Sequence, residues 1–527
     1  MREENVMSQK DTMKNKETSE RKQTRRESAK EVKDTLGEIL LGSTGAGERQ
    51  QYAKQAIMAS LQQNQSVFQQ IFAPDKNYDI IERQLEIGGR SAVLYMIDGF
   101  TDAGSLQRMI QFFYSLKPEG MPESGQRFME QMLPYGEVGV LEDMDAVASA
   151  FLAGITCLFI DGYSSCFIVD CRQYPTRGVQ EPEKDKVLRG SRDGFVETLI
   201  FNTALIRRRI RDPRMTVEIT QVGRRSRTDV AVCYMEGEVD DRVLDHVKRR
   251  LANLQVDALT MNQESLAECL YKGSWYNPFP KFKFSERPDT AAACLLQGSI
   301  VILVDNSPAA MILPSSIFDV IEEADDYYFP PVTGTYLRLT RFATSILALF
   351  LTPTYLLLMQ NPQWAPPWLE FALVSDTINV PLFLQILLLE FFIDGLRLAS
   401  VNTPGMLTTP LSVIAAIVLG DYAVQSGWFN AEIMLYMAFV ALANSSQASF
   451  EMTYAVKFMR MLLVILTACF NVWGFITGVV ITLVAIAGNR TIGGRSYLYP
   501  LIPFDGSALR KRLLRVRIPH EHGEVED

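Results

Sequence analysis

Three charged residues interrupt an apolar stretch in the second half of the chain. In LFLQILLLEFFIDGLRLA, residues 382–399, they are Glu390, Asp394 and Arg397, and their spacing places them on one side of a helix. A carboxylate inside a bilayer is costly and usually faces a bundle interior or water, where acidic groups favour cations. The pattern predicts either a cation pathway, or an internal Asp394–Arg397 ion pair with Glu390 hydrogen-bonded inside the bundle.

The next apolar stretch, residues 406–425, has a different character. It carries small and hydroxyl-bearing side chains and no charge before Asp421. Such side chains let helices approach closely, and they also suit a pore wall with a hydrophobic gate. Helix packing and pore lining both remain open as explanations. The residues that would support or line an ion pathway here are Thr408, Thr409, Ser412, Val413 and Ala416.

A basic cluster lies at the end of a predicted helix in the first half of the chain. Apolar residues at three-and-four spacing predict an amphipathic helix over 195–210, and cations near its C-terminus complement the helix dipole. We expect a solvated surface or a subunit contact here, with docking on anionic lipids as the alternative. The cluster consists of Arg207, Arg208, Arg209, Arg211 and Arg214.

No combination of residues points to catalysis or to a metal. The chain has three histidines, and its seven cysteines occur without a C-x-x-C pair, which is typical of thiols in a reducing compartment. The motifs G-x-S-x-G, H-E-x-x-H and the Walker loop do not occur. We therefore expect no enzyme, no cofactor and no metal site. The net charge of −9 argues against binding of nucleic acid by the chain as a whole.

The composition changes abruptly near residue 335. Up to that point the chain is polar with short apolar runs, whereas residues 340–488 are dominated by long ones. Strand-like runs with a period of two alternate with helical patterns before the change. We expect an α+β soluble region made of two α/β subdomains, followed by an α-helical polytopic membrane domain. The expected boundaries are a disordered charged tail (1–50), the subdomains (51–190 and 191–335), the transmembrane domain (336–488) and a basic C-terminal tail (489–527).

Five apolar segments define the predicted membrane topology. They cover residues 342–359, 379–399, 406–425, 431–448 and 461–487. Basic residues favour the cytosolic side, and they gather before the first segment and in the C-terminal tail. Five crossings would separate these two regions. We therefore favour four crossings, with 431–448 re-entrant or interfacial, and retain five as the alternative. No secretory signal opens the sequence, so we expect the N-terminal region to be cytosolic.

Several long motifs resemble a known family. VLRGSRDGFVETLIFNTALIRRRIRDPRM, NPFPKFKFSERPDTAAACLLQGSIVILVDNSP and EEADDYYFPPVTGTYLRLTRF are similar to the A subunits of GerA-type spore germination proteins, over about 84–519. KFMRMLLVILTACFNVWGF and GGRSYLYPLIPFDG resemble the branch of that family called stage V sporulation protein AF.

This resemblance implies a multi-pass protein of the endospore inner membrane with a cytosolic N-terminal domain. It further implies a homo-oligomeric ring that forms an ion channel and releases cations during germination, beside other spore inner-membrane proteins and lipids. A non-conducting scaffold or signalling subunit that binds another spore membrane protein is the alternative.

Overall fold

The structure is a computed structural model that describes residues 55–173, 189–271, 277–374, 376–402 and 422–515. The predicted N-terminal tail lies outside these residues. So do Thr408, Thr409, Ser412, Val413 and Ala416, the residues proposed to support or line an ion pathway in the third apolar segment.

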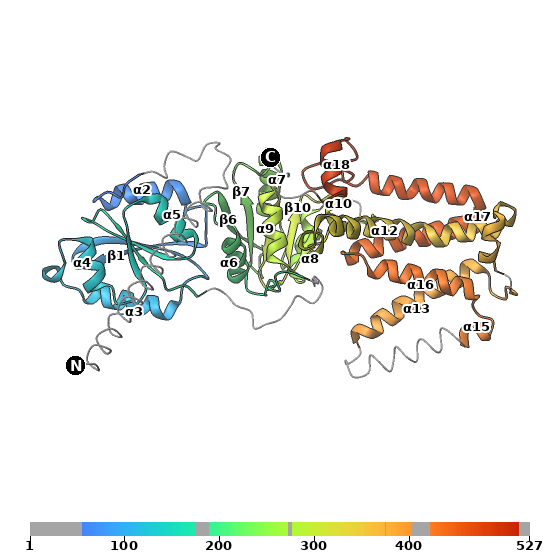
Figure 1. Cartoon of the computed structure of the whole chain (residues 1–527), viewed down its shortest axis with the longest axis horizontal. Helices are drawn as coiled ribbons and strands as arrows, with labels where there is room; N and C mark the ends of the chain where they lie inside the picture. Colours follow the sequence, from blue (N-terminus) through green and yellow to red (C-terminus); the bar gives the residue numbers. More distant parts are fainter. Residues whose placement is uncertain (1–54, 174–188, 272–276, 375, 403–421, 516–527) are drawn as a thin grey trace, which may run out of the picture. The chain divides into compact units, whose positions relative to one another are not determined.

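The first sheet has five antiparallel strands in the order β1-β2-β4-β5-β3 (Figure 1). The strands are β1 (Ile80–Ile87), β2 (Arg90–Ile97), β3 (Val138–Leu141), β4 (Thr156–Ile160) and β5 (Cys166–Val169). Side chains alternate along β2, so Tyr95 points to one core and Leu94 to another. Helices α2 (Leu61–Phe72) and α5 (Met144–Leu152) cover the first face, and α3 (Ala103–Ser115) and α4 (Gly125–Met132) cover the second. A short 3-10 helix, η1 (Pro118–Gly120), precedes α4.

The second sheet repeats this strand order as β6-β7-β9-β10-β8. Its strands are β6 (Met215–Val222), β7 (Thr228–Met235), β8 (Lys283–Ser285), β9 (Ile300–Val304) and β10 (Ala310–Leu313). Helices α6 (Leu199–Arg209) and α9 (Pro288–Leu296) cover one face, and α7 (Asp241–Ala252) and α8 (Asn262–Leu270) cover the other. The N-terminal region is thus α/β, as the sequence predicts.

Two short helices connect the second sheet to the helical region. In α10 (Ile317–Ile321) a reciprocal capping box joins the Ser316 and Asp319 side chains to each other's backbone N–H. Helix α11 (Asp325–Tyr328) follows, and α12 (Pro331–Gln360) begins three residues later with Pro331 at its first position, where the missing N–H costs nothing.

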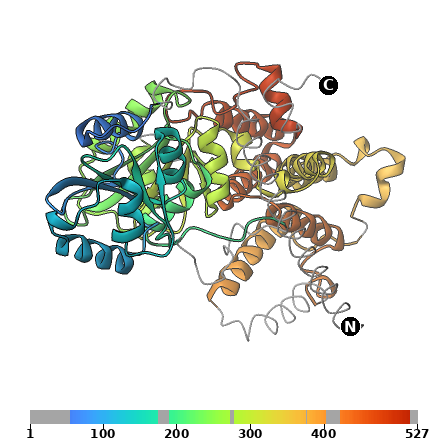
Figure 2. The same cartoon turned by 60° about the vertical axis from the view of Figure 1, so that its left-hand side comes forward.

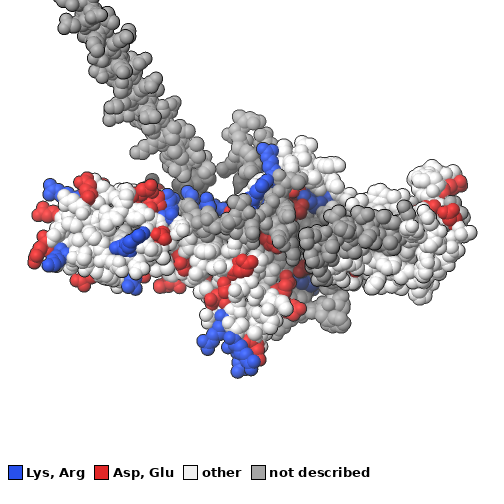
Figure 3. Space-filling model, turned by 90° about the horizontal axis from the view of Figure 1, so that it is seen from below, with Lys and Arg blue, Asp and Glu red and all other residues white. Residues whose placement is uncertain are grey.

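The helical region contains α12, α13 (Leu382–Asn402), α15 (Ala423–Gln425), α16 (Ala431–Ser445), α17 (Phe450–Ala487) and α18 (Gly506–Leu513). The 3-10 turns η2 (Pro362–Trp364) and η3 (Pro367–Ala372) follow α12. Helix α12 packs beside α16 and α17 (Figures 1 and 2). On the face in Figure 3, charged side chains are spread over the α/β region, whereas the helical region shows few.

The fifth apolar segment, expected to be a single traverse, is a helical hairpin. Asn471 interrupts α17 with a left-handed φ of 50° and a ψ of −129°, which no helix accommodates. A Cβ atom placed on Gly478 would lie 3.3 Å from the Cα of Leu463, fifteen positions earlier. A straight helix would separate these residues by about 22 Å, so the chain reverses at Asn471. Residues 450–470 and 472–487 therefore run antiparallel.

Hydrogen bonds define two ends of this bundle. At one end the Asn361 Nδ2 donates to Asn471 Oδ1 at 2.6 Å, so the C-terminus of α12 meets the turn of α17. At the other, the Asn277 Nδ2 donates to Ala485 O at 2.8 Å, so α17 returns to the second α/β subdomain. Among the described residues, α12 and the two arms of α17 taken together are long and apolar enough to contain a membrane span, by length and composition.

Candidate functional site

The carboxylates that the sequence singles out in α13 belong to a buried charged cluster. The side chain of Glu390, with 2% of the residue exposed, accepts from Arg460 Nε at 2.7 Å, and Arg460 Nη2 lies 2.5 Å from the same oxygen. Arg460 is fully buried and also donates through Nη1 to the carbonyl oxygen of Ala348 at 2.6 Å. One guanidinium thereby connects α17, α13 and α12.

Lys457 completes this cluster one helical turn before Arg460. Its ammonium pairs with Asp394, lies 3.5 Å from a carboxylate oxygen of Glu390, and donates to the Glu390 carbonyl at 3.3 Å. The spacings 390–394 and 457–460 place both members of each pair on one side of their helix, so the two pairs face each other. We call Glu390, Asp394, Lys457 and Arg460 the charged cluster. It contains two acids and two cations and is formally neutral.

The predicted Asp394–Arg397 pair is wrong. Asp394 pairs with Lys457, and the guanidinium of Arg397 lies over the ring of Tyr454, 5.7 Å from its centroid. The physical reason is burial: Lys457 is 5% exposed and requires a carboxylate, whereas Arg397 is half-buried and is accommodated by an aromatic face.

A second charged group lies at the base of α12, and we call it the junction network. The guanidinium of Arg338 donates to Glu322 at 2.8 Å, to Asp326 at 3.2 Å, and to the carbonyl oxygens of Lys511 and Arg512. Arg341 pairs with the other oxygen of Asp326 at 2.7 Å. The network joins α12 to the linker after the second sheet and to α18.

Glu322 is ionised in this network because its neighbours outweigh its burial. Burial alone raises the pKa of Glu322, but the positive charges of Arg512, Lys283 and Arg338 hold it below the ordinary value of 4.5. The sequence shows Arg338 and Arg341 before the first apolar segment, where basic residues indicate the cytosolic side. That both are buried in ion pairs follows only from the fold.

The arginine cluster around the end of α6, predicted to be a solvated surface or a contact site, is only partly exposed. Arg207 is 1% exposed and forms a bidentate ion pair with Asp79, at 2.9 Å and 3.0 Å, which connects the second α/β subdomain to the first. A subunit or lipid contact through Arg207 is therefore wrong, because its guanidinium is consumed inside the fold. Arg209 pairs with Asp193, and Arg214 pairs with Asp212 at 2.8 Å. Arg208 and Arg211 are exposed.

Comparisons with known proteins show which family the chain resembles over most of its length. A family model described as Bacillus/Clostridium GerA spore germination protein matches residues 66–524. Stage V sporulation protein AF of Bacillus subtilis is 34% identical over 457 residues, covering 86% of this chain and 92% of the relative. Spore germination protein KA of the same organism is 28% identical over 446 residues, covering 83% and 81%.

A solved structure matches about half of the chain. It is the N-terminal domain of the A subunit of the Bacillus megaterium spore germinant receptor GerK3, with 24% identity and a TM-score of 0.39. The match covers 50% of this chain and 97% of that domain.

The described residues form two α/β subdomains with antiparallel sheets, followed by apolar helices that enclose paired charges. The chain belongs to the GerA spore germination family, and the resemblance stated from its motifs, including the similarity to stage V sporulation protein AF, is confirmed.

Proposed function

We propose that this chain is an ion-conducting membrane subunit of the spore germination machinery that oligomerises as a ring in the endospore inner membrane. The observation that carries the proposal is the charged cluster, because buried ion pairs among apolar helices are typical of a helical bundle that encloses a polar interior. The family membership supports a role in germination. Other spore inner-membrane proteins and lipids are the partners that this role requires.

Within this proposal the charged cluster stabilises the bundle, and the third apolar segment lines the path. The carboxylate of Glu390 is directed at Arg460 and Lys457 of its own chain, which leaves it poorly placed to coordinate a passing cation. Asp394 is likewise paired with Lys457, and Arg397 lies over the ring of Tyr454. The hydroxyl-bearing segment that includes Thr408, Thr409 and Ser412 then supplies the wall.

The arrangement of the described helices supports six passes with both termini cytosolic. Helix α12 leads away from the α/β region and α13 returns. Helix α16 also returns, since Ser446 contacts Thr344, where the apolar part of α12 begins. The hairpin of α17 adds an even number of passes. If 406–425 crosses as predicted, then α12, α13, this segment, α16 and the two arms of α17 make six passes. The basic tail then lies on the cytosolic side, and α16 does not have to be re-entrant.

Cation release from proteoliposomes tests conduction. The full-length protein should release entrapped cations, and Glu390→Gln, which leaves the cluster with one surplus positive charge, should change the rate. Thr409→Trp should reduce it by narrowing the path. Both variants must assemble as the wild type does, as judged by size-exclusion chromatography. Unchanged release from both would contradict the pore assignment.

Topology is tested at the turn of α17. After Cys469→Ser removes the nearby thiol, Trp473→Cys should react with a membrane-impermeant maleimide added from the non-cytosolic side. A single traverse over 461–487 would bury that position in the bilayer and prevent the reaction.

A non-conducting scaffold that binds another spore membrane protein is the second candidate. It is favoured by the neutrality of the charged cluster, which presents no surplus acid among the described residues. Co-purification of a spore membrane protein with a chain that gives no cation flux would establish this candidate instead.

A further inference from the structure

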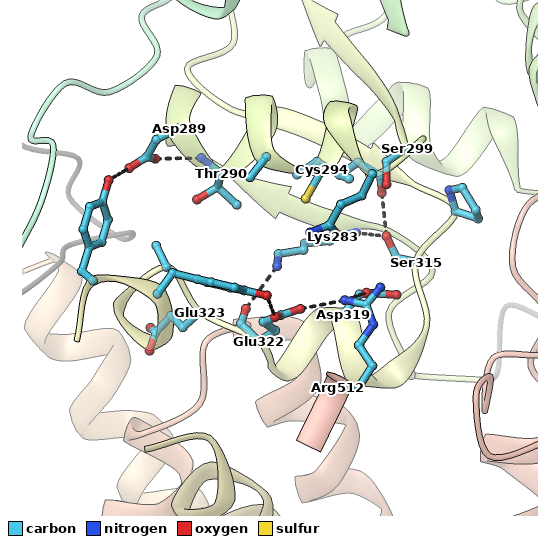
Figure 4. A pocket seen from close by; sticks show the side chains of 17 residues that line it. Lys283, Asp289, Thr290, Cys294, Ser299, Ser315, Asp319, Glu322, Glu323 and Arg512 are labelled. Atoms are coloured by element: carbon cyan, nitrogen blue, oxygen red, sulfur yellow. Dashed lines mark hydrogen bonds and ion pairs between the residues drawn. The ribbon is translucent and has the colours of Figure 1, made fainter. Parts of the chain in front are cut away.

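A cavity of about 310 Å³ lies between the second α/β subdomain and the elements at the base of α12 (Figure 4). Strand β8 and helix α9 form one wall, and α10, α11 and Arg512 of α18 form the other. Its apolar lining includes Ala293, Ile312 and Pro314. The size is that of small-molecule sites.

The carboxylates around this cavity all have cationic partners. Asp289 pairs with Arg287 at 2.6 Å, and Glu323 with Arg341 at 2.8 Å. Asp319 and Glu322 share Arg512, at 2.7 Å and 2.8 Å. These ion pairs hold the two walls of the cavity together.

Lys283 is different, because its ammonium lines the cavity and acts on Glu322 only at longer range, where its charge helps to lower the pKa of that carboxyl. Within the described residues its Nζ donates to one acceptor, the carbonyl oxygen of Glu322 at 3.1 Å, and forms no ion pair. An ammonium group has three N–H donors, so two remain for a ligand. In Figure 4 the side chain extends from β8 toward Glu322, across the space between the two walls.

We propose that this cavity binds a small organic carboxylate, with the carboxylate on Lys283 and an apolar body against Ala293, Ile312 and Pro314. One ammonium matches one negative charge, which favours a monocarboxylate over a dianionic phosphate, for which a second uncommitted cation would be needed. The inference stands independently of conduction.

Occupancy of the cavity is coupled to the first long helix through Glu322. This residue lines the cavity, receives Lys283 on its carbonyl oxygen, and binds Arg338 of α12 through its carboxylate at 2.8 Å. A ligand that draws the Lys283 ammonium away from Glu322 acts directly on the junction network. The cavity thus regulates the contact between the α/β region and α12.

Cys294, which also lines the cavity, provides the test. The full-length protein in detergent is alkylated with iodoacetate, itself a small carboxylate, or with neutral iodoacetamide, and each cysteine is followed by mass spectrometry. Both reagents react with the thiolate. The ratio of the iodoacetate rate to the iodoacetamide rate at one cysteine therefore does not depend on the fraction of that thiol that is ionised. By Coulomb's law, a unit positive charge in a water-like medium raises the concentration of a monoanion about threefold at a separation of about 6 Å.

We expect the ratio of the iodoacetate rate to the iodoacetamide rate at Cys294 to fall about threefold in Lys283→Met. In Lys283→Arg, which keeps the positive charge, this ratio should stay at the wild-type value. Lys281→Met, two positions away and outside the cavity lining, is the matched control and should leave the ratio unchanged. Sodium butyrate should slow alkylation of Cys294 by iodoacetamide, whereas 1-butanol should not, and Cys269 should respond to neither. A ratio insensitive to Lys283→Met, the absence of butyrate protection, or a Cys294 inert to both reagents would each overturn the proposal.

Discussion

Breaking the charged cluster should be far more costly than neutralising it. Glu390→Leu leaves the fully buried Arg460 without its carboxylate, and Arg460→Leu leaves Glu390 close to Lys457 alone. Two unit charges about 4 Å apart at an effective dielectric constant near 20 attract by roughly 4 kcal/mol. Removing one partner of a buried pair costs about 3–5 kcal/mol. Each single substitution should lower the free energy of unfolding by that amount.

The double variant Glu390→Leu/Arg460→Leu removes both charges, and Lys457 keeps Asp394. It should lie within about 1–2 kcal/mol of the wild type, since apolar replacement of a whole buried pair is often neutral. Reversible unfolding of the full-length protein in mixed micelles, followed by tryptophan fluorescence, measures all three variants. Arg211→Leu, an exposed arginine, serves as the control. Single costs below about 1 kcal/mol, or a double cost equal to the sum of the singles, would refute the reasoning.

Three further outcomes follow from the structure. Arg207→Leu should destabilise the α/β region by about 3–5 kcal/mol, because it leaves Asp79 buried and uncompensated, and chemical denaturation of the full chain measures this loss. Asn471→Gly should lower the thermal midpoint less than Asn471→Val, since both lose the hydrogen bonds to Asn361 but a β-branched residue also resists a φ of 50°. Burial lowers the pKa of Lys281 from 10.5 to about 8, so the unfolded chain binds more protons between these values. The free energy of unfolding should therefore rise from pH 8 to pH 10.5, and Lys281→Met should remove that rise.

Periodicity correctly identified the polar side of α13 but not its partners. The spacing of Glu390 and Asp394 shows that both carboxylates share a side of the helix. Their cations lie more than sixty residues later in α17, and only tertiary packing brings them together. Lys457 and Arg460 have a matching spacing of three residues just before the last apolar segment.

The reversal in α17 was concealed by uniform hydrophobicity. A single span needs about 20 residues, and the run from Phe450 to Ala487 is nearly twice that length. Asn471 and Gly474 are the signals in the sequence, because asparagine adopts a positive φ more readily than most residues and glycine permits close backbone contact. Arg207 shows the opposite difficulty: it resembled its exposed neighbours Arg208 and Arg211, and only the fold places Asp79 beside it.

The measurement that tests the central claim most directly compares cation flux in proteoliposomes for Glu390→Leu/Arg460→Leu and Thr409→Trp. If the charged cluster stabilises the bundle and the third apolar segment lines the path, the double variant should conduct like the wild type and Thr409→Trp should conduct little. Loss of flux in the double variant, with normal flux through Thr409→Trp, would contradict the account and place the path at Glu390.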